Sequence, residues 1–270
     1  MSLIYVFAAS RSEGRPVEQL PLAGSSGNEN GLVQARTAGA NRVTLIITGI
    51  GPRDARTHAS AALGLDRAGD FKHSGASARP DAVIVIGLCG ALSASLHEAA
   101  IVAYSGVLSI EVSQPPLPCT RILRERITSL LAARGVSCEL AAGITSPRMA
   151  VTREEKLRLA ENGASVVDME SYEILSAAAK ATVPAVVLRV VSDTLDARLP
   201  DFNCALSAEG RIETHKAAPI ALRHPLQTAK LLLANRRAME RLSKALEIVL
   251  QSDIFENLPS ISSQPLGAKS

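Results

Sequence analysis

Four acidic side chains stand directly after apolar, strand-like runs of the sequence: Glu13, Asp168, Glu170 and Asp193. In open α/β sheets, ligands bind beyond the carboxyl ends of the strands. Acids that reach this edge from different strands can converge on one crevice and act there as general acids and bases. Helix capping is the alternative, because Asp168 and Asp193 could each accept hydrogen bonds from backbone N–H groups. Spacing alone leaves both interpretations open.

A glycine-rich turn over residues 49–52 follows one apolar run and precedes a helical pattern. An anion or a ribose can bind at such a helix N-terminus. The turn is only a partial dinucleotide-binding motif, because Gly49 and Gly51 are followed by Asp54 at the third glycine position. A match of two glycines favours the simpler interpretation, a tight turn between strand and helix.

Several common kinds of site have no signature in the sequence. It contains no G-x-S-x-G, H-E-x-x-H or P-loop motif, and its four cysteines form no C-x-x-C pair. Aromatic residues make up 3% of the chain and the net charge is +3, which does not predict a nucleic-acid partner. We expect no metal site, and we expect Cys89, in a glycine-rich turn, to be an inert packing residue.

The elements that must position these residues follow from the apolar pattern. Strands are predicted over residues 3–9, 43–47, 83–86, 101–110 and 184–191. Helices are predicted over residues 53–68, 120–134, 152–162 and 169–181. Thr152 with Glu155 fits a capping box, and the unbroken apolar run 83–86 predicts a strand buried on both faces. This alternation predicts an α/β fold, a three-layer sandwich whose mixed, mainly parallel central sheet is flanked by helices.

We expect one domain over residues 1–251 and a flexible tail over residues 252–270. Residues 24–30 predict a loop, and residues 67–80 form a polar insertion. No apolar run approaches the ~18 residues that a membrane span needs. The N-terminus lacks the basic stretch of a signal peptide, so the expected location is the cytoplasm.

The C-terminal helix predicted over residues 226–250 is basic and amphipathic. Basic residues interleave with its apolar positions, and Glu240 and Glu247 are its only acids. Such a helix can make peripheral contact with an anionic membrane surface. The alternative is a helix that packs on the sheet and keeps its basic face in solvent.

Four motifs in order resemble the superfamily of purine nucleoside phosphorylases and methylthioadenosine/S-adenosylhomocysteine nucleosidases. They are Thr-Gly-Ile-Gly at 48–51, Gly-Leu-Cys-Gly-Ala-Leu at 87–92, Val-Asp-Met-Glu-Ser at 167–171 and Val-Ser-Asp-Thr at 191–194. Residues 199–250 are similar to the hopanoid-associated branch, whose members are thought to release adenine from adenosylhopane. One departure is Glu-Ala-Ala-Ile at 98–101, where the family usually has Gly-Asp before a strand.

The resemblance implies roles for the acids in cleaving an N-ribosyl bond. Asp193 would be the general acid that protonates purine N7, kept protonated by burial. Glu170 would accept hydrogen bonds from the ribose 2′ and 3′ hydroxyls, and its charge suits the oxocarbenium-like sugar. Met169 would pack against the ribose. Glu13 falls where the nucleosidases keep the glutamate that activates water.

The resemblance also implies a lining for the substrate site. Ala150 and Val151 would line the base pocket and bond the purine through their backbone groups. Ser192 would support Asp193 or the base. Phe202 could close over the site, or it could simply pack. The glycine-rich turns would bring further residues to the substrate, namely Gly51, Leu88 and Gly90.

Hydrolysis and phosphorolysis differ in the nucleophile. A phosphate site needs hydroxyl, backbone N–H and arginine donors, and the phosphorylases typically carry Thr or Ser where this chain has Leu88. Glu13 would repel phosphate but suits a water molecule. Both features favour hydrolysis, whereas Arg11 and Arg53 are the residues that could reach a phosphate.

We therefore expect a nucleosidase that acts on a 5′-substituted adenosine, small or lipid-linked, with adenosylhopane as the preferred substrate. It would need no metal and no organic cofactor. The resemblance implies a homodimer or a higher oligomer. A phosphate-dependent purine nucleoside phosphorylase and a non-catalytic nucleotide-binding module are the alternatives.

Overall fold

The computed structural model describes residues 1–20, 33–65, 79–207 and 210–258. In this part of the chain, nine strands form one sheet: β1 (Leu3–Ala8), β2 (Val33–Ala38), β3 (Asn41–Ile47), β4 (Ala82–Ala91), β5 (Ile101–Ser109), β6 (Leu117–Pro118), β7 (Glu139–Thr145), β8 (Val166–Asp168) and β9 (Ala185–Asp193). Their order is β2-β3-β1-β4-β8-β7-β5-β6, and β9 pairs with both β4 and β5. The sheet is mixed: β1 runs parallel to β3 and β4, for example, whereas β2 runs antiparallel to β3.

Five of these strands close a ring. Strand β9 pairs with β4 and β5, β5 pairs with β7, β7 with β8, and β8 with β4. Near the end of β4, Gly90 is in register with Val167 of β8 and with Asp193 of β9. The ring therefore brings two of the acidic motifs to one point of the sheet.

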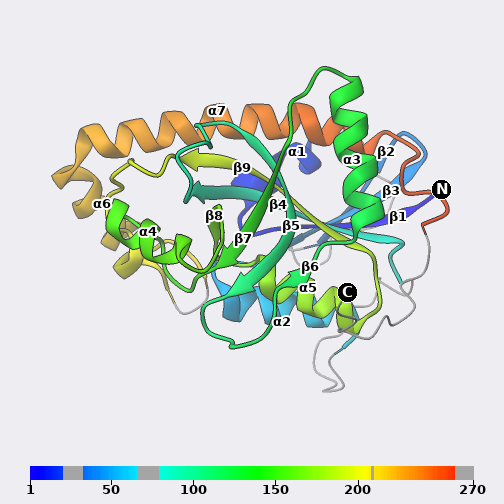
Figure 1. The fold of residues 1–270 in the computed structure, drawn as a ribbon, viewed down its shortest axis with the longest axis horizontal. Coiled ribbons are helices and arrows are strands. Elements are labelled where there is room, and N and C mark those ends of the chain that lie inside the picture. Colours follow the sequence, from blue (N-terminus) through cyan, green and yellow to red (C-terminus); the bar gives the residue numbers. More distant parts are fainter. Residues whose placement is uncertain (21–32, 66–78, 208–209, 259–270) are drawn as a thin grey trace.

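Helices cover both faces of the sheet, as Figure 1 shows. They are α1 (Arg11–Glu18), α2 (Pro52–Ala62), α3 (Arg121–Ala133), α4 (Arg153–Ala160), α5 (Ser171–Lys180), α6 (Thr214–Arg223) and α7 (Pro225–Leu250), with a short 3-10 turn at η1 (Asn203–Ala205). Helices α1, α3 and α7 lie along one face, and α2 and α5 lie on the other. The predicted layered α/β architecture is confirmed.

The core lies where the strands are covered on both sides. Every residue of β9 is buried, and the run 83–86 of β4 has no exposed surface. Strands buried on both faces carry continuous apolar runs rather than alternating ones, because helices exclude water from each side. This explains why both strands could be predicted from the sequence.

Local signals set several helix ends. Thr152 and Glu155 form the predicted capping box at the start of α4. Helix α2 ends at Ala62, before the end of the predicted 53–68, because Gly64 follows with φ of +70° and cannot continue a right-handed helix. Helix α1 was not predicted, because Val17 is its one large apolar residue and its other buried residues are Glu13 and Gly14.

The start of the predicted flexible tail is packed against the body. Phe255 is buried, and the Arg126 guanidinium donates to the carbonyls of Ile254 and Glu256. The Asn41 side-chain amide donates to the Ser252 carbonyl at 2.7 Å. The prediction of a flexible chain from residue 252 onward is therefore wrong for its first residues.

The predicted loop at 24–30 and most of the predicted insertion at 67–80 lie outside the described residues. Among the described residues, no helix is both long and apolar enough to cross a membrane. The C-terminal half of α7 buries Ala238, Leu242, Leu246 and Val249, as the packed alternative predicts.

Candidate active site

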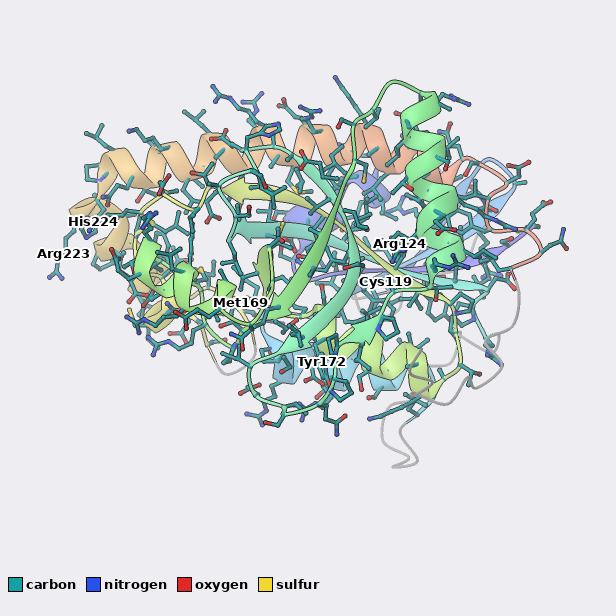
Figure 2. All side chains as sticks on the ribbon, viewed as in Figure 1. Cys119, Arg124, Met169, Tyr172, Arg223 and His224 are labelled. Carbon is teal, nitrogen blue, oxygen red and sulfur yellow. The ribbon has the colours of Figure 1, made fainter. Side chains whose placement is uncertain are left out.

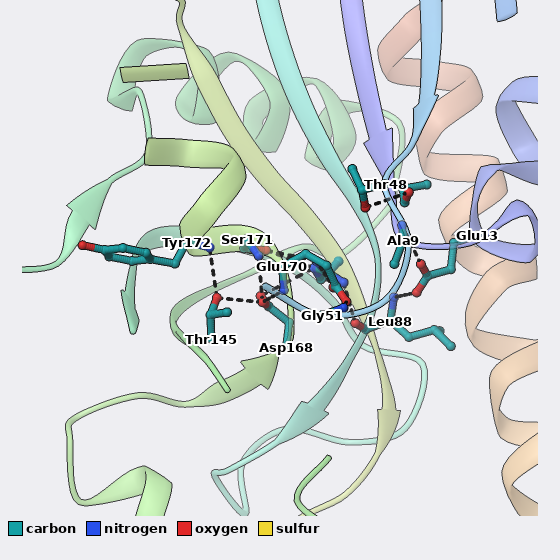
Figure 3. A network of polar contacts seen from close by, with 12 residues as sticks. Ala9, Glu13, Thr48, Gly51, Leu88, Thr145, Asp168, Glu170, Ser171 and Tyr172 are labelled. Atoms are coloured by element: carbon teal, nitrogen blue, oxygen red, sulfur yellow. Dashed lines mark hydrogen bonds and ion pairs between the residues drawn. The ribbon is translucent and has the colours of Figure 1, made fainter. Parts of the chain in front are cut away.

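Glu170 stands just before α5, and donors from two distant elements hold its carboxylate. The Gly51 N–H donates to Oε1 at 3.0 Å, and Arg189 Nη2 donates to Oε2 at 3.0 Å. Figure 3 shows Glu170 directed at the Gly51 turn, with Leu88 close by. The turn needs a glycine at 51, where φ is +105°. The glycine-rich turn at 49–52 is thus part of the site.

Glu13 stands in the first turn of α1, which Ser10 caps by accepting from the Glu13 N–H. Its Oε1 accepts from the Leu88 N–H at 2.8 Å, and its Oε2 accepts from the Ala9 N–H at 3.1 Å. Figure 3 shows both contacts. A Cβ at Gly87 would lie 2.7 Å from Glu13 Oε1, so only glycine lets the carboxylate approach this strand.

Arg189 lies in the middle of β9 and is fully buried. Besides Glu170, its guanidinium donates to the Leu88 carbonyl at 2.9 Å and to Ser171 Oγ at 3.2 Å. Its Nε lies 3.6 Å from Asp168 Oδ2. Arg189 was not among the site residues predicted from the sequence; its signal is a cation inside the otherwise apolar run 185–191.

Burial controls the charges of this cluster. It raises the pKa of Glu170 to about 7; the Arg189 cation opposes the rise, and the charges of Glu13 and Asp168 add to it. Burial also raises the pKa of Glu13, against the opposing effect of Arg189. For Arg189, burial alone disfavours the cation, but the surrounding acids outweigh it and raise its pKa. One guanidinium therefore compensates several acids that water does not reach.

Asp193 ends β9 and is also buried, but it has a different partner. Lys156 Nζ, from α4, lies 2.5 Å from Asp193 Oδ2. Ser192 Oγ donates to Asp193 Oδ1 at 2.6 Å, so Ser192 supports this acid. Burial of Asp193 agrees with the expectation, but the expectation did not include the buried cation that contacts it. Lys156 was missed because a lysine on a helix is normally exposed.

The segment of β4 that follows Gly87 connects the two acidic groups. Leu88 binds Glu13 through its N–H, and a Cβ at Gly90 would lie 3.0 Å from Asp193 Oδ2. Two residues of a strand span about 7 Å. The acids from β1–α1, β8–α5 and β9 thus converge on one short stretch of backbone.

Asp168 has a structural role, as the capping alternative predicts. Its Oδ1 accepts from the N–H groups of Glu170 and Ser171, each at 3.0 Å. It also accepts from Thr145 Oγ1 at 2.9 Å, and Figure 3 shows this network. Asp168 therefore fixes the backbone turn that presents Glu170.

The backbone at Ala150 and Val151, which was expected to bond the purine base, makes contacts within the protein instead. Ala150 and Val151 are both buried. The Val151 N–H donates to Glu155 Oε2 at 2.7 Å, and its carbonyl accepts from the Leu199 N–H at 3.0 Å. The N–H of Val151 is thus already used, because the capping-box glutamate takes it, and it cannot bond a purine in this arrangement.

A pocket of about 910 Å³ opens beside Glu170. Gly51 and Met169 line it, and Figure 2 shows where Met169 lies on the ribbon. Phe202 is half-buried beside it; its neighbours Asp201 and Asn203 are in the wall. The remaining lining is Ile50, Pro52, Arg53, Asp54, Arg56, Glu111, Val112, Pro147, Arg148, Cys204, Leu206, Ser207 and Gly210.

The family model described as "Phosphorylase superfamily" matches residues 6–218. No curated protein matches the sequence.

Solved structures with the same fold include two nucleosidases and a hydrolase. The futalosine hydrolase of Helicobacter pylori is 14% identical, with a TM-score of 0.69 over 92% of this chain and 97% of that one. The methylthioadenosine/S-adenosylhomocysteine nucleosidase of Neisseria meningitidis, bound to methylthio-immucillin-A, is 16% identical, with a TM-score of 0.69 over 93% and 99%. The S-adenosylhomocysteine nucleosidase of Streptococcus pyogenes is 16% identical, with a TM-score of 0.69 over 96% and 98%.

Proposed function

The chain belongs to the phosphorylase superfamily, and from this premise we propose that it hydrolyses the N-ribosyl bond of a purine nucleoside. The observation that carries the proposal is the position of Glu13. Its buried carboxylate occupies the Leu88 N–H, a donor that a phosphate in this turn would need. A carboxylate repels a phosphate anion but accepts a proton from water. The nucleosidase names of two similar structures agree with this choice.

The acids of the site act on different parts of the nucleoside, Glu13 and Glu170 on the sugar and Asp193 on the purine. Glu13 takes a proton from the water that attacks the sugar C1′. Glu170, held by Gly51 and Arg189, accepts the ribose hydroxyls and stabilises the positive charge that develops on the sugar. Asp193 passes a proton to N7 of the departing purine. Arg189 favours the ionised form of the ribose-side carboxylate, because it is the cation in contact with it.

The preferred substrate is a 5′-substituted adenosine, with adenosylhopane as the specific proposal. A pocket of about 910 Å³ beside Met169 has room for a bulky substituent. Ile50, Val112 and Leu206 give part of its wall an apolar surface. Arg53 also lines this pocket, and it is the feature that favours the alternative, a phosphate-dependent phosphorylase.

Adenine release measured by chromatography tests the proposal. The substrates are methylthioadenosine, adenosine and a lipid extract that contains adenosylhopane, each with and without phosphate. We expect release that is independent of phosphate and that falls at least ~100-fold in Asp193→Asn, since general acids contribute 10²–10⁴-fold. No release from any substrate, with nucleoside binding unchanged in the variant, would instead support a non-catalytic binding module.

A second proposal concerns the surface formed by α6 and the start of α7. Residues 214–239 contain no Asp or Glu and carry five Lys or Arg side chains. Leu222 and Leu226 are 80% and 78% exposed, and Leu232 and Leu233 are exposed beside them. Figure 2 shows Arg223 and His224 at the outer end of the molecule, where the two helices meet. Three of the five cations pair with acids that flank the stretch, Lys216 with Glu213, Arg236 with Glu240 and Arg237 with Glu98. The exposed leucines, with the cations around them, are complementary to an anionic lipid surface, so we propose peripheral membrane contact here.

Flotation with vesicles tests the membrane contact. We expect binding to vesicles with anionic lipid and none to neutral vesicles. Leu222→Ser with Leu226→Ser should weaken it at least ~10-fold, whereas Leu140→Ser, at an exposed leucine of β7, should not. The alternative is that this surface is the interface of a homo-oligomer. Sedimentation that shows the double variant dissociating, with no vesicle binding by the unchanged chain, would assign the leucines to a second copy.

A further inference from the structure

We propose that Lys156 is the source of the proton that Asp193 delivers to the purine. Lys156 acts through Asp193 and does not touch the substrate. This inference rests on the proposed N-ribosyl hydrolysis and assigns the acid side of that same site. It begins from a buried ion pair that the family motifs did not indicate.

The contacts of Lys156 identify its form. The residue is fully buried, and its Nζ lies 2.5 Å from Asp193 Oδ2, 2.5 Å from the Thr194 carbonyl and 3.5 Å from the Ala197 carbonyl. Every partner is an acceptor. An ammonium group has three N–H donors for three acceptors, whereas a neutral amine has two. Lys156 is therefore an ammonium ion in this arrangement.

The partners of Asp193 identify its form as well. Both carboxylate oxygens accept hydrogen bonds, Oδ2 from Lys156 and Oδ1 from Ser192. The Ser192 hydroxyl has one proton and two acceptors within reach, Asp193 Oδ1 at 2.6 Å and the Cys89 carbonyl at 3.1 Å, so it does not by itself fix the form of Asp193. The Lys156 ammonium does, because a fully buried cation needs an anionic partner and Asp193 is the acid in contact with it. Asp193 is therefore a carboxylate in the resting protein, and the proton needed by N7 is not on it. The nearest proton that can move lies on Lys156.

The transfer balances as follows. As the C1′–N9 bond breaks, its electron pair moves to the purine; Lys156 gives a proton to the Asp193 carboxylate, and Asp193 passes a proton on to N7. At the other face, water adds to C1′ and gives its proton to Glu13. Lys156 then stands as a neutral amine and Glu13 as a carboxylic acid. Proton exchange with solvent restores both groups.

Few other ionisable groups among the described residues face this pair. From β4, Cys89 lies close enough to feel the charge of Asp193, and burial raises its thiol pKa far above the usual range. From α4, Glu155 caps its own helix. At the surface, Arg153 pairs with Asp196. Cys89 is therefore a neutral neighbour of the Lys156–Asp193 pair.

The test compares Lys156→Gln with the unchanged chain on two leaving groups. Glutamine keeps N–H donors for the carbonyls of Thr194 and Ala197 but carries no transferable proton. We expect adenine release at pH 8 to fall at least ~100-fold, the size of a general-acid contribution. Hydrolysis of 4-nitrophenyl riboside, whose leaving group needs no proton, should stay within ~3-fold. Lys156→Met serves as the second variant.

The pH profile gives an independent readout. Without Lys156, the proton must bind to Asp193 from solvent, and a carboxyl group holds a proton less firmly than an amine. The alkaline limb of kcat/KM should therefore move at least one pH unit lower in Lys156→Gln. The control is Arg158→Met, an exposed cation of the same helix, which should change neither limb nor rate.

Two outcomes would overturn the inference. If both substrates slow equally, or if glutamine restores the normal rate and profile, Lys156 only positions Asp193. Failure of the proposed function gives a different result. If the unchanged chain cleaves neither substrate, the proposal of N-ribosyl hydrolysis is wrong, and the Lys156–Asp193 pair is a structural ion pair.

Discussion

At the scale of single residues, Arg189 sets the charge of the ribose side of the site. It is in contact with Glu170 and lies near Asp168 and Glu13, all of them buried. Removing one partner of a buried ion pair leaves an uncompensated charge, which is costly because water cannot replace the partner. The cation that holds Glu170 for catalysis is therefore also one that the fold needs.

Replacing Arg189 tests this double role. We expect Arg189→Met to lower the free energy of unfolding by about 3–5 kcal/mol, the usual cost of breaking a buried pair. Urea denaturation at pH 8, above the pKa of about 7 of Glu170, measures it. The exposed Arg158→Met should change stability by less than about 0.5 kcal/mol. Equal stability of both variants would show that the acids are neutral in the folded chain.

The acid limb of activity follows from the same acids. Glu170 has a pKa raised to about 7 by burial, and the pKa of Glu13 is raised as well. Both act as carboxylates, so kcat/KM should fall as the pH decreases through about 7. The sign for stability is opposite: the raised pKa of Glu170 favours the folded state at low pH, and that contribution is lost as the pH rises towards 7.

A profile of kcat/KM between pH 5 and pH 9 checks this expectation. An acid limb near the ordinary pKa of a glutamate would contradict the raised pKa of Glu170, and the absence of any acid limb would mean that neither carboxylate is needed in its ionised form.

At the scale of elements, the turn within β4 connects the two halves of the site. Leu88 binds Glu13 and Arg189 through its two backbone groups, and Gly90 lies against Asp193. Because these are backbone contacts, the side chain at 88 does not make them. Gly87 and Gly90 matter more than the Leu88 side chain, because they let the carboxylates of Glu13 and Asp193 lie close to the backbone of β4.

The variant Gly87→Ala tests whether the turn at Gly87 positions Glu13 for activity. Its φ is +140°, and a Cβ would lie 2.7 Å from Glu13 Oε1, so the new methyl group must displace the carboxylate. We expect at least a ~100-fold loss of kcat, measured by adenine release, because misplaced catalytic groups cost about this much. Gly64→Ala is the control: its φ is also positive, but nothing lies within 4 Å. A loss of activity in Gly64→Ala of the same size would point to backbone strain rather than collision.

How far the sequence predicts the elements depends on burial. Long apolar runs marked β1, β3, β4, β5 and β9, and a capping box marked α4. Helix α1 escaped notice because it buries little apolar surface, although it carries Glu13. The burial of Arg189 and Lys156 could not be predicted from the sequence either, because arginine and lysine are normally exposed. The N–H of Val151 is taken by Glu155, a tertiary contact that a motif does not reveal.

At the scale of the whole molecule, chain order and sheet topology explain the site together. Glu13 lies 155 positions before Asp168 and 180 positions before Asp193 in the sequence. The closed ring of β4, β9, β5, β7 and β8 places their motifs around one stretch of β4. Motif order predicted which acids belong together, but the two buried cations and the strand ring needed the structure.

The sugar product formed in phosphate buffer tests the central proposal most directly. The chain would be incubated with methylthioadenosine or adenosine, and the sugar would be identified by mass spectrometry. Glu13 in contact with the Leu88 N–H predicts a free sugar and no sugar 1-phosphate, with the rate at least ~100-fold lower in Glu13→Gln. A sugar 1-phosphate as the main product would contradict the proposal and assign phosphorolysis to this site.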